Sequence, residues 1–404
     1  MSKAYDAIIV GARCAGSPTA MLLARMGYRV LVLDRATFPS DTLSTHVVHP
    51  IGAAMLAKWG LLDGLIATGC PPIDTYAFDF GPFTIAGTPG TADAPLSYCP
   101  RRTILDKLLV EAAAAAGAEI REGFTVDEIV TEGGRVVGIR GHSKGCSVVE
   151  ERARVVVGAD GRNSIVASAV LPEQYHEKPA LLASYYTYWS GLPMQGRFEI
   201  YIRPHRGFAA VPTHDGLTLV IAGWPYAEFE ANKSDIESHY LKAFELAPVF
   251  AERVRGARRE ARFAGAAVPN FFRKPYGPGW ALVGDAGYNK DPITAQGITD
   301  AFCDAQRCAI ALDEAFSESR SFESTMGDYQ RARDDHALPM YEFTCQLAAL
   351  EPPPPELQRL LGAVHGNRQT MDDFVRMNAG TISPAAFFAP ENVGQIMAGS
   401  TVPY

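Results

Sequence analysis

Apolar positions follow two different patterns along the chain, and each pattern predicts a different kind of sheet. Short continuous apolar runs occur at 6–10 (DAIIV), 29–33 (RVLVL), 155–158 (VVVG) and 280–283 (WALV). Runs of this length are typical of strands buried on both faces, as in a parallel sheet. Between about 170 and 270 apolar and polar residues alternate instead, as at 198–203 (FEIYIR). Alternation is typical of strands with one buried face, so this stretch predicts a second, antiparallel-sheet module.

The first 34 residues predict a β-α-β unit. The apolar run at 6–10 ends in a glycine turn at 11–16, and residues 17–26 are rich in helix formers. Gly27 is a suitable helix stop, and the apolar run at 29–33 ends at Asp34. A strand, a helix and a second strand within about 30 residues imply a parallel sheet, and hence an α/β fold.

The turn at 11–16 (GARCAG) matches the dinucleotide-binding fingerprint G-x-G-x-x-G at Gly11 and Gly16, with Arg13 in place of the middle glycine. Its context agrees with nucleotide binding, because a strand precedes it and a helix follows it. Asp34 lies 23 residues after Gly11, near the distance expected of a ribose contact. The alternative is a tight turn without a ligand, with Asp34 as a solvated acid at the strand end.

Further elements follow from the same patterns. Residues 103–118 predict a helix, 120–140 a hairpin, and 148–158 and 217–222 strands. A long helix is expected to end near 316, and the residues after it are helical in character with proline-rich breaks. Aromatic residues are numerous between 185 and 229. They either fill the core of the second sheet or line an apolar ligand pocket on one face of it.

Composition narrows the class of protein. The 404 residues carry a net charge of −8 and a sequence pI near 5.6, which argues against a nucleic-acid binder. No apolar run approaches the roughly 18–20 residues of a membrane span, and the first apolar stretch is too short for a signal peptide, so we expect a cytoplasmic protein. The seven cysteines are scattered without a Cys-x-x-Cys pair, so neither a metal site nor a disulfide framework is expected.

Three segments rich in glycine and acidic residues, at 11–16, 158–164 and 284–297, each follow an apolar strand. Ligands of open α/β sheets bind beyond the carboxyl ends of the strands, so three such segments suit one long ligand. The first segment suits a pyrophosphate at a helix N-terminus, and the third offers a second helix N-terminus that can stabilise a negatively charged redox ring. A flavin dinucleotide fits better than a nicotinamide one, because a reduced flavin becomes anionic.

Together these segments resemble the three motifs of the FAD-dependent monooxygenases of the para-hydroxybenzoate hydroxylase type, a group related to geranylgeranyl reductases and flavin halogenases. DAIIVGARCAG…LVLD is similar to the N-terminal fingerprint, VVVGADGRNSIVA to the Asp-Gly motif, and ALVGDAGYNKDPITAQGITDAF to the Gly-Asp motif. The resemblance spans nearly all of residues 4–345. It implies a discontinuous Rossmann-like FAD-binding domain (1–170 and 270–345), an antiparallel β-sheet substrate domain (171–269) and a helical C-terminal extension (346–404).

The same resemblance implies a set of FAD contacts, position by position. The pyrophosphate is expected beside the N-terminal turn, and the flavin beside the stretch that follows the Gly-Asp motif. Grouped by the part of FAD expected beside them, the residues are Gly11, Arg13, Cys14, Ala15 and Gly16 (pyrophosphate), Asp34 (ribose), Arg35 and Val126 (adenine), Arg102, Asp160 and Gly161 (FAD), Asp285 (ribityl chain), and Pro292, Gly297 and Ile298 (flavin). For Asp285 the alternative is a helix cap.

The chain departs from the family pattern at several positions. Tyr288 stands where the Gly-Asp motif commonly has a histidine, and Ala167 where the Asp-Gly motif often ends in arginine. Both departures bear on NAD(P)H binding more than on FAD binding. The halogenase motif Trp-x-Trp-x-Ile-Pro is absent from the sequence. His46 and His49 lie in a segment expected beside the flavin, where they either face the ring or, as we expect, are polar loop histidines.

The resemblance implies an FAD-dependent oxidoreductase. The leading hypothesis is an NAD(P)H-dependent monooxygenase that uses O₂ and a C4a-hydroperoxyflavin to hydroxylate an apolar or aromatic small molecule. The alternative within the fold is a flavin-dependent C=C reductase or dehydrogenase of the geranylgeranyl reductase type, and a third hypothesis is a flavin-binding protein without turnover. Because the cofactor carries the chemistry, no catalytic side chain is assigned.

Overall fold

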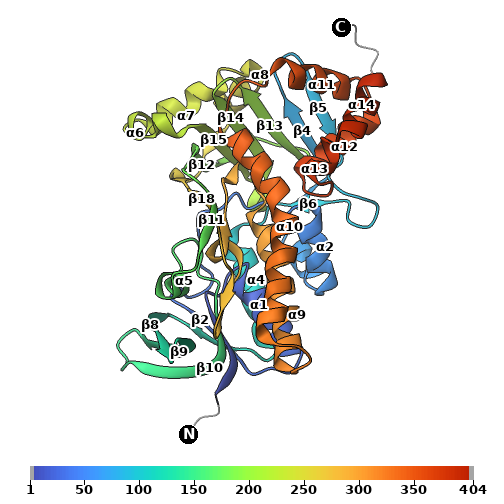
Figure 1. Ribbon diagram of the computed structural model, residues 1–404. Helices are drawn as coiled ribbons and strands as arrows, with labels where there is room; N and C mark the ends of the chain where they lie inside the picture. Colours follow the sequence, from blue (N-terminus) through green and yellow to red (C-terminus); the bar gives the residue numbers. More distant parts are fainter. Residues whose placement is uncertain (1–3, 400–404) are drawn as a thin grey trace.

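The computed structural model describes residues 4–399, which form two modules stacked along one long axis (Figure 1). The first module, at the bottom of the view, holds a mainly parallel sheet, and the second, at the top, holds a mainly antiparallel sheet. Helix α10 (Phe322–Ala348) runs from the first module towards the second. This architecture confirms the predicted α/β class, with a Rossmann-like module, a second sheet and a helical C-terminal region.

The first sheet has the strand order β19-β20-β10-β1-β2-β7, and the five strands from β20 to β7 run parallel. The antiparallel pair β8 and β9 continues from β10. The strands are β1 (Tyr5–Val10), β2 (Val30–Asp34), β7 (Glu119–Glu122), β8 (Phe124–Glu132), β9 (Arg135–Ser143), β10 (Val149–Gly158), β19 (Tyr276–Gly277) and β20 (Trp280–Leu282).

The central strands of this sheet are apolar throughout because both of its faces are covered. On β1, Ala7 and Ile9 belong to one apolar cluster, and Ile8 and Val10 to another. The first cluster includes side chains of α1, α4 and α9, and the second includes side chains of β8, β9 and α5. The helices of this module are α1 (Gly16–Arg25), α2 (Pro50–Lys58), α3 (Leu62–Ala67), α4 (Arg102–Ala115), α5 (Ile165–Val170) and α9 (Gly297–Phe316).

The second sheet has the order β16-β12-β15-β14-β13-β4-β5, with β17 also paired to β12. Its neighbours run antiparallel except for β13 and β4, which run parallel. The strands are β4 (Thr75–Asp79), β5 (Thr84–Gly87), β12 (Leu182–Ser190), β13 (Arg197–Arg203), β14 (Arg206–Pro212), β15 (Thr218–Pro225), β16 (Arg258–Arg259) and β17 (Ala264–Ala267).

The pairing of the second sheet departs from the predicted limit between the first two domains. Residues 1–170 were all expected in the FAD-binding domain, yet β4 and β5 extend the second sheet beyond β13. Pairing satisfies the backbone groups of β13, which would otherwise form an exposed edge. It also buries Tyr76 and Phe78 in an apolar cluster with the C-terminal helices. The strands β4 and β5 are so short that their alternation of apolar and polar residues does not reveal, in the sequence, that they belong to the second sheet.

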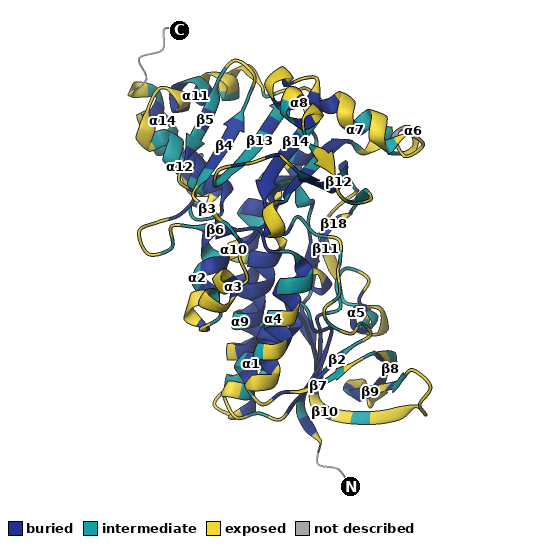
Figure 2. Cartoon of the chain, turned by 180° about the vertical axis from the view of Figure 1, so that it is seen from behind, coloured by how far each residue is buried: buried dark blue, intermediate teal, exposed yellow. Residues whose placement is uncertain are grey.

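The two faces of the second sheet pack against different helices. One face meets α7 (Ile236–Phe244) and α8 (Pro248–Arg255) through buried aromatic residues such as Phe208 and Phe250. The opposite face shares an apolar cluster with the C-terminal helices. In Figure 2 these outer helices are buried on their inner sides and exposed on their outer sides. They are α6 (Phe229–Asn232), α7 and α8 on one face, and α11 (Pro355–His365), α12 (Arg368–Asn378), α13 (Pro384–Phe387) and α14 (Pro390–Ala398) on the other.

Short strands complete the fold: β3 (Pro72–Ile73) pairs with β6 (Ser97–Tyr98), and β18 (Asn270–Arg273) lies between β11 (Gln174–Lys178) and β21 (Tyr288–Asn289). None of the helices between residues 4 and 399 is long and apolar enough to cross a membrane.

Candidate cofactor and substrate site

The three motif segments meet at the carboxyl ends of β1, β10 and β20. Gly11 follows β1 with a φ of 102°, and a Cβ added there would lie 2.4 Å from the carbonyl oxygen of Ala159, directly after β10. Only glycine tolerates both this φ and this approach. A Cβ added to Gly284, which follows β20, would lie 2.9 Å from the Cβ of Ala15. These close approaches bring the segments together in one groove at the strand ends, where α/β sheets bind ligands.

Asp34, at the end of β2, reaches the same turn. Its Oδ2 accepts a hydrogen bond from Ala12 N at 2.8 Å, and its Oδ1 accepts one from Ala36 N at 2.8 Å. The side chain is half-buried rather than a solvated strand-end acid. A carboxylate oxygen can accept a second hydrogen bond, so Asp34 can still bind a ligand hydroxyl.

Asp106 on α4 forms ion pairs with two arginines of the groove, and it was not among the residues predicted from the sequence. Its fully buried carboxylate binds Arg13 and Arg102, with Arg102 Nε at 2.9 Å, and lies 3.4 Å from Cys14 Sγ. Arg13 also donates to the Ser40 carbonyl at 3.2 Å, so it does not point to solvent. Two arginines on one carboxylate leave a net positive charge beside the turn, which favours an anion. The i,i+4 spacing of Arg102 and Asp106 was the available signal.

Three features of the groove fit FAD. Asp160 accepts a hydrogen bond from Ile165 N at 2.7 Å through Oδ2, but its Oδ1 is buried without a partner among the described residues. Asp285 is solvent-accessible, and desolvation by the surrounding protein raises its pKa, while Arg102 opposes the rise. Gly297, at the N-terminus of α9, has open space where a Cβ would lie. The carboxylates can accept hydrogen bonds from ribityl hydroxyls, and the open helix N-terminus can stabilise an anionic ring.

The other predicted contacts differ in their surroundings. Pro292 begins the short turn η4 (Pro292–Thr294) before α9, and Ile298 is buried in the first apolar cluster. Gly161 follows Asp160 with a φ of 79°, and Val126 is half-buried on β8. Arg35 is exposed and makes no hydrogen bond or ion pair with any residue that the structure describes. Asp285 lies within the turn η3 (Gly284–Ala286), whose N-cap is Val283, so it is not a helix cap.

His46 is buried, so the expectation of a polar loop histidine is wrong for this residue. Its Nε2 lies 2.5 Å from the Tyr188 hydroxyl, and its Nδ1 has no partner among the described residues. Burial, together with the charges of Arg102 and Arg101, lowers the pKa of His46 to about 3. Arg101 in turn lies over the Tyr188 ring at 4.9 Å. Neutral His46, Tyr188 and Arg101 therefore form one contact cluster close to Arg102 of the groove.

His49 is also buried, and it connects the loop before α9 to the second sheet. Its Nε2 lies 3.1 Å from the Thr294 carbonyl oxygen and its Nδ1 lies 2.8 Å from the Tyr76 hydroxyl. Burial lowers the pKa of His49 to about 4, although the hydrogen bond to Thr294 opposes the shift. A carbonyl can only accept, so neutral His49 donates from Nε2 to Thr294. His49 therefore fixes the position of the loop.

Tyr288 belongs to a buried polar network behind the same loop. Its ring stacks on Phe272 with centroids 4.9 Å apart, and its hydroxyl is hydrogen-bonded to Asp300. Lys290 forms a buried ion pair with Asp300. Burial raises the pKa of Tyr288 well above its ordinary value, so the phenol stays protonated. Tyr288 is therefore part of the buried network that packs next to the loop at 292–295.

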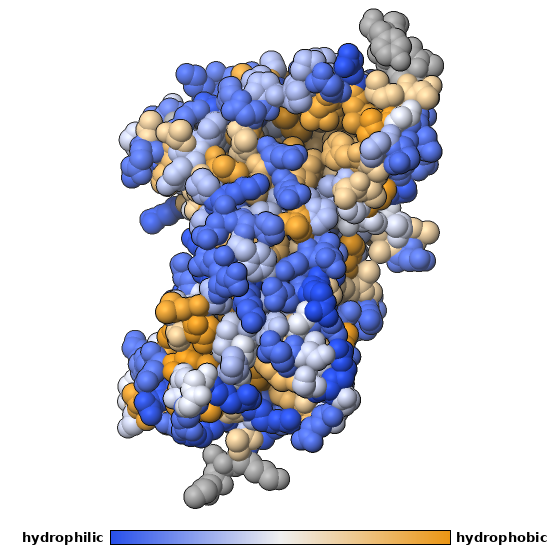
Figure 3. All heavy atoms as spheres, in the orientation of Figure 1, coloured by the Kyte–Doolittle hydropathy of each residue, from blue (hydrophilic) through white to orange (hydrophobic). Residues whose placement is uncertain are grey.

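A cavity of about 850 Å³ adjoins this loop. One wall is the face of the second sheet that turns away from α7 and α8, and the other is made by α10 and the C-terminal helices. In Figure 3 hydrophobic side chains surround a hollow near the top of the molecule, beside the C-terminal helices. Some of the aromatic residues between 185 and 229, such as Trp224, fill the core instead. The cavity suits an apolar ligand next to the predicted flavin position.

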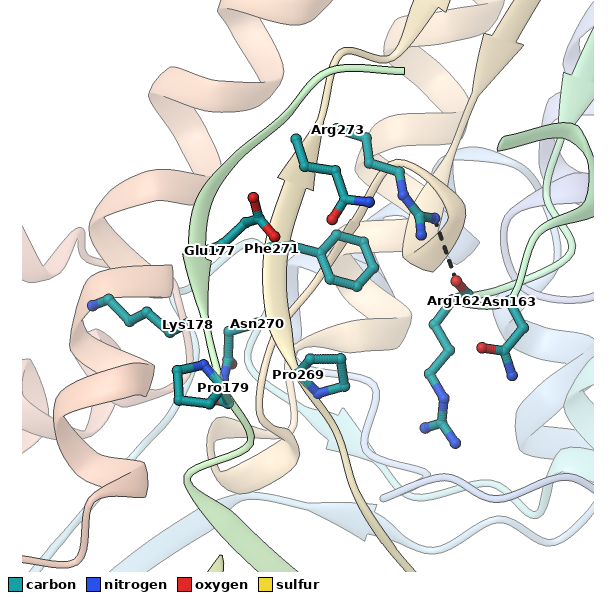
Figure 4. Close-up of a pocket in the computed structure, with 10 residues that line it drawn as sticks. Arg162, Asn163, Glu177, Lys178, Pro179, Pro269, Asn270, Phe271 and Arg273 are labelled. Atoms are coloured by element: carbon teal, nitrogen blue, oxygen red, sulfur yellow. Dashed lines mark hydrogen bonds between the residues drawn. The ribbon is translucent and has the colours of Figure 1, made fainter. Parts of the chain in front are cut away.

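A second, more polar hollow of about 540 Å³ lies between the end of the segment 158–164, β11 and β18 (Figure 4). Arg162, Lys178 and Arg273 line it, and Arg273 Nη1 donates to the Arg162 carbonyl at 3.3 Å. One acidic side chain, Glu177, also lines this hollow. The excess of positive charge favours a phosphorylated ligand.

The fold and the groove define a dinucleotide-binding oxidoreductase, and comparison with known proteins gives the family. The model of the FAD binding domain family matches residues 4–344, so the chain belongs to this family. It is an FAD-dependent oxidoreductase of the family that the three motifs resemble.

Two relatives illustrate the range of the family. Digeranylgeranylglycerophospholipid reductase 1 of Methanopyrus kandleri is 26% identical over 356 residues, which cover 86% of this chain and 91% of the relative. The 6-methylpretetramide 4-monooxygenase of Streptomyces rimosus is 28% identical over 318 residues, which cover 74% of this chain and 73% of the relative.

Solved structures share the fold. A flavoprotein/dehydrogenase from Cytophaga hutchinsonii superposes with a TM-score of 0.83 at 18% identity, covering 98% of this chain and 99% of that chain. The myxobacterial chondrochloren halogenase CndH superposes with a TM-score of 0.80 at 22% identity, covering 100% of this chain and 98% of that chain.

Proposed function

We propose that this protein is an NAD(P)H-dependent monooxygenase that hydroxylates an apolar or aromatic small molecule. The observation that carries the proposal is the apolar cavity, which opens onto the loop at 292–295 between the FAD groove and the second sheet. Substrate, O₂, NAD(P)H and one proton would give hydroxylated substrate, water and NAD(P)⁺. Bound FAD would supply the redox chemistry of both half-reactions.

The same proposal assigns the cofactor contacts predicted from the sequence. The turn at 11–16, with Arg13 and Arg102 neutralised in part by Asp106, would hold the pyrophosphate. Asp34 would accept from the ribose, and Asp160 and Asp285 would accept from hydroxyls of the ribityl side. The α9 N-terminus at Gly297 would stabilise negative charge on the flavin.

The protein contributes position and exclusion of water. Apolar walls keep bulk water from the reacting atoms, which strengthens every electrostatic interaction in the site. Neutral His49 holds the Thr294 carbonyl and so fixes the loop that separates cavity and cofactor. No step in this scheme requires a side-chain nucleophile.

The nicotinamide nucleotide would bind by its phosphates in the polar hollow, where Arg162 and Arg273 supply positive charge. We expect Arg162→Ala to raise the KM for NAD(P)H roughly tenfold, the effect of losing one hydrogen bond to a charged group. The matched control is Arg258→Ala, an exposed arginine of the second module. An unchanged KM in Arg162→Ala would contradict this placement.

The proposed reaction is tested with the FAD-loaded enzyme, NADPH or NADH, isotopically labelled O₂ and apolar phenols. The expected result is one labelled oxygen atom in the product and NAD(P)H oxidation that is faster with substrate than without it. A product without labelled oxygen would refute monooxygenation.

A second function has a specific observation in its favour. The relative that aligns over 86% of this chain is a digeranylgeranylglycerophospholipid reductase, and an apolar cavity also suits reduction of an isoprenoid C=C bond. Product formation without O₂, from FAD reduced beforehand, would favour this reductase function over the monooxygenase.

A further inference from the structure

The cavity is elongated along two parallel strands. On β13 the side chains of Phe198, Ile200 and Ile202 line it in succession, and on β4 the side chains of Tyr76 and Phe78 do the same. The parallel register pairs Phe198 with Tyr76 and Ile200 with Phe78. At about 3.3 Å per residue, the wall from 198 to 202 is about 13 Å long.

The two ends of this wall differ in chemistry. At the inner end, beside Tyr76, lie His49, Thr294 and the hydroxyl of Thr45, which makes no hydrogen bond to any residue that the structure describes. At the outer end lie Phe83 and residues 352–354 of the proline-rich connector between α10 and α11. Polar groups are therefore gathered next to the cofactor groove, whereas the side chains that β4 and β13 turn into the cavity along this wall are apolar. Further polar side chains, Gln346, Glu351 and Gln358, come from α10, the connector and α11.

The cavity wall offers no free positive charge. Among the described residues, Arg203 is the one arginine or lysine that lines the cavity. Its guanidinium forms an ion pair with Asp79 at 2.7 Å, so its charge is already neutralised. The same guanidinium also donates to the carbonyl oxygens of Asp79 at 2.8 Å and Leu246 at 2.9 Å. A carboxylate or phosphate inside the cavity would lose its hydration without gaining a positively charged partner.

We propose that the substrate is an elongated, uncharged amphiphile with a compact polar end and an apolar tail. The polar end lies between Thr45 and His49, and the tail extends along β4 and β13 for about 13 Å towards the outer end. This inference names the substrate class for the proposed function and rests on it. Ile202 limits the length of the tail that the cavity accepts.

The test measures binding of 4-alkylphenols, from ethyl to octyl, to the FAD-loaded protein by calorimetry. The expected result is an affinity that rises about threefold to fourfold with each added methylene, as for full burial of that group. We also expect 4-octylbenzoate, which is charged, to bind more weakly than 4-octylphenol. An affinity that is flat beyond ethyl, or absent binding across the series, overturns the proposal.

A variant pair locates the tail. Ile202→Trp should leave 4-ethylphenol binding unchanged and weaken 4-octylphenol at least tenfold, because the added ring occupies the outer part of the cavity. Ile310→Trp is the matched control, since Ile310 is 47% exposed on α9 and lies outside the cavity. Equal weakening of both phenols by Ile202→Trp contradicts the proposed orientation. The length series in the unmodified protein tests the proposal without either variant.

Failure of this inference is distinguishable from failure of the proposed function. Length-dependent binding without labelled oxygen in any product would refute the monooxygenase and leave the shape of the substrate supported. Hydroxylation of a compact phenol, together with an affinity that does not change with tail length, would support the monooxygenase and refute the proposed shape of the substrate.

Discussion

At the scale of single residues, Asp106 is the carboxylate on which the cofactor groove depends. It is fully buried and binds two arginines, so its replacement leaves positive charge in the protein without a counterion. We expect Asp106→Asn to lower the free energy of unfolding by about 3 kcal/mol, the effect of breaking a buried ion pair. Urea denaturation measures it, with Glu111→Gln as the control on the same helix, where the pair with Lys107 is exposed. A small effect in both variants would contradict this role.

His49 gives the stability a dependence on pH. Its pKa is about 4 in the folded protein and near 6.5 in the unfolded chain, so the unfolded chain binds more protons between these values. The contribution of His49 is therefore complete above about pH 6.5 and decreases as the pH falls towards 4. From about pH 7.5 to about pH 5, we expect the intact protein to lose about 2 kcal/mol more stability than His49→Gln.

Urea denaturation at the two pH values checks the difference between the proteins. This comparison cancels the opposite effect of Asp291 and Asp304, whose pKa values burial raises to about 7. His365→Gln, at an exposed histidine, should keep the pH dependence of the intact protein. Equal slopes for the intact protein and His49→Gln would contradict the prediction.

At the scale of elements, the turn between β1 and α1 depends on the end of β10. Gly11 and Gly117 have nearly the same φ, 102° and 104°, but a Cβ meets the Ala159 carbonyl only at Gly11 and meets nothing within 4 Å at Gly117. Gly117→Ala should therefore cost about 1 kcal/mol for its backbone conformation alone. Gly11→Ala should cost more and abolish FAD binding, as measured by denaturation and by the flavin absorbance of the purified protein. Equal costs would mean that the close approach is unimportant.

The elements that the sequence predicted well are those whose burial is decided locally. The β1-α1-β2 unit, α9 and the hairpin of β8 and β9 have strong periodicity and clear glycine boundaries. The histidines were predicted less well, because the burial of His46 and His49 comes from Tyr188 and Tyr76, which lie on strands distant in sequence. Asp106 was hidden for the same reason, since Arg13 reaches it from another element.

At the scale of the whole molecule, the chain passes repeatedly between the modules, so we expect them to unfold together. The four tryptophans report on both: Trp59 and Trp280 lie in the first module, and Trp189 and Trp224 in the second. In Trp59→Phe/Trp280→Phe and in Trp189→Phe/Trp224→Phe, the fluorescence change should coincide with the loss of far-ultraviolet circular dichroism in urea. Separate midpoints in either protein would show that the modules unfold independently.

The placement of β4 and β5 has a consequence for how such enzymes acquire new specificities. The wall of the apolar cavity, where we propose that the substrate binds, includes residues from 75–87, from the strands between 182 and 225 and from helices after 355. A chimera that grafted only the middle stretch of a relative would join one parent's sheet to the other parent's edge strands and covering helices. Exchange of specificity between relatives therefore favours point substitutions on the sheet face over the shuffling of whole segments.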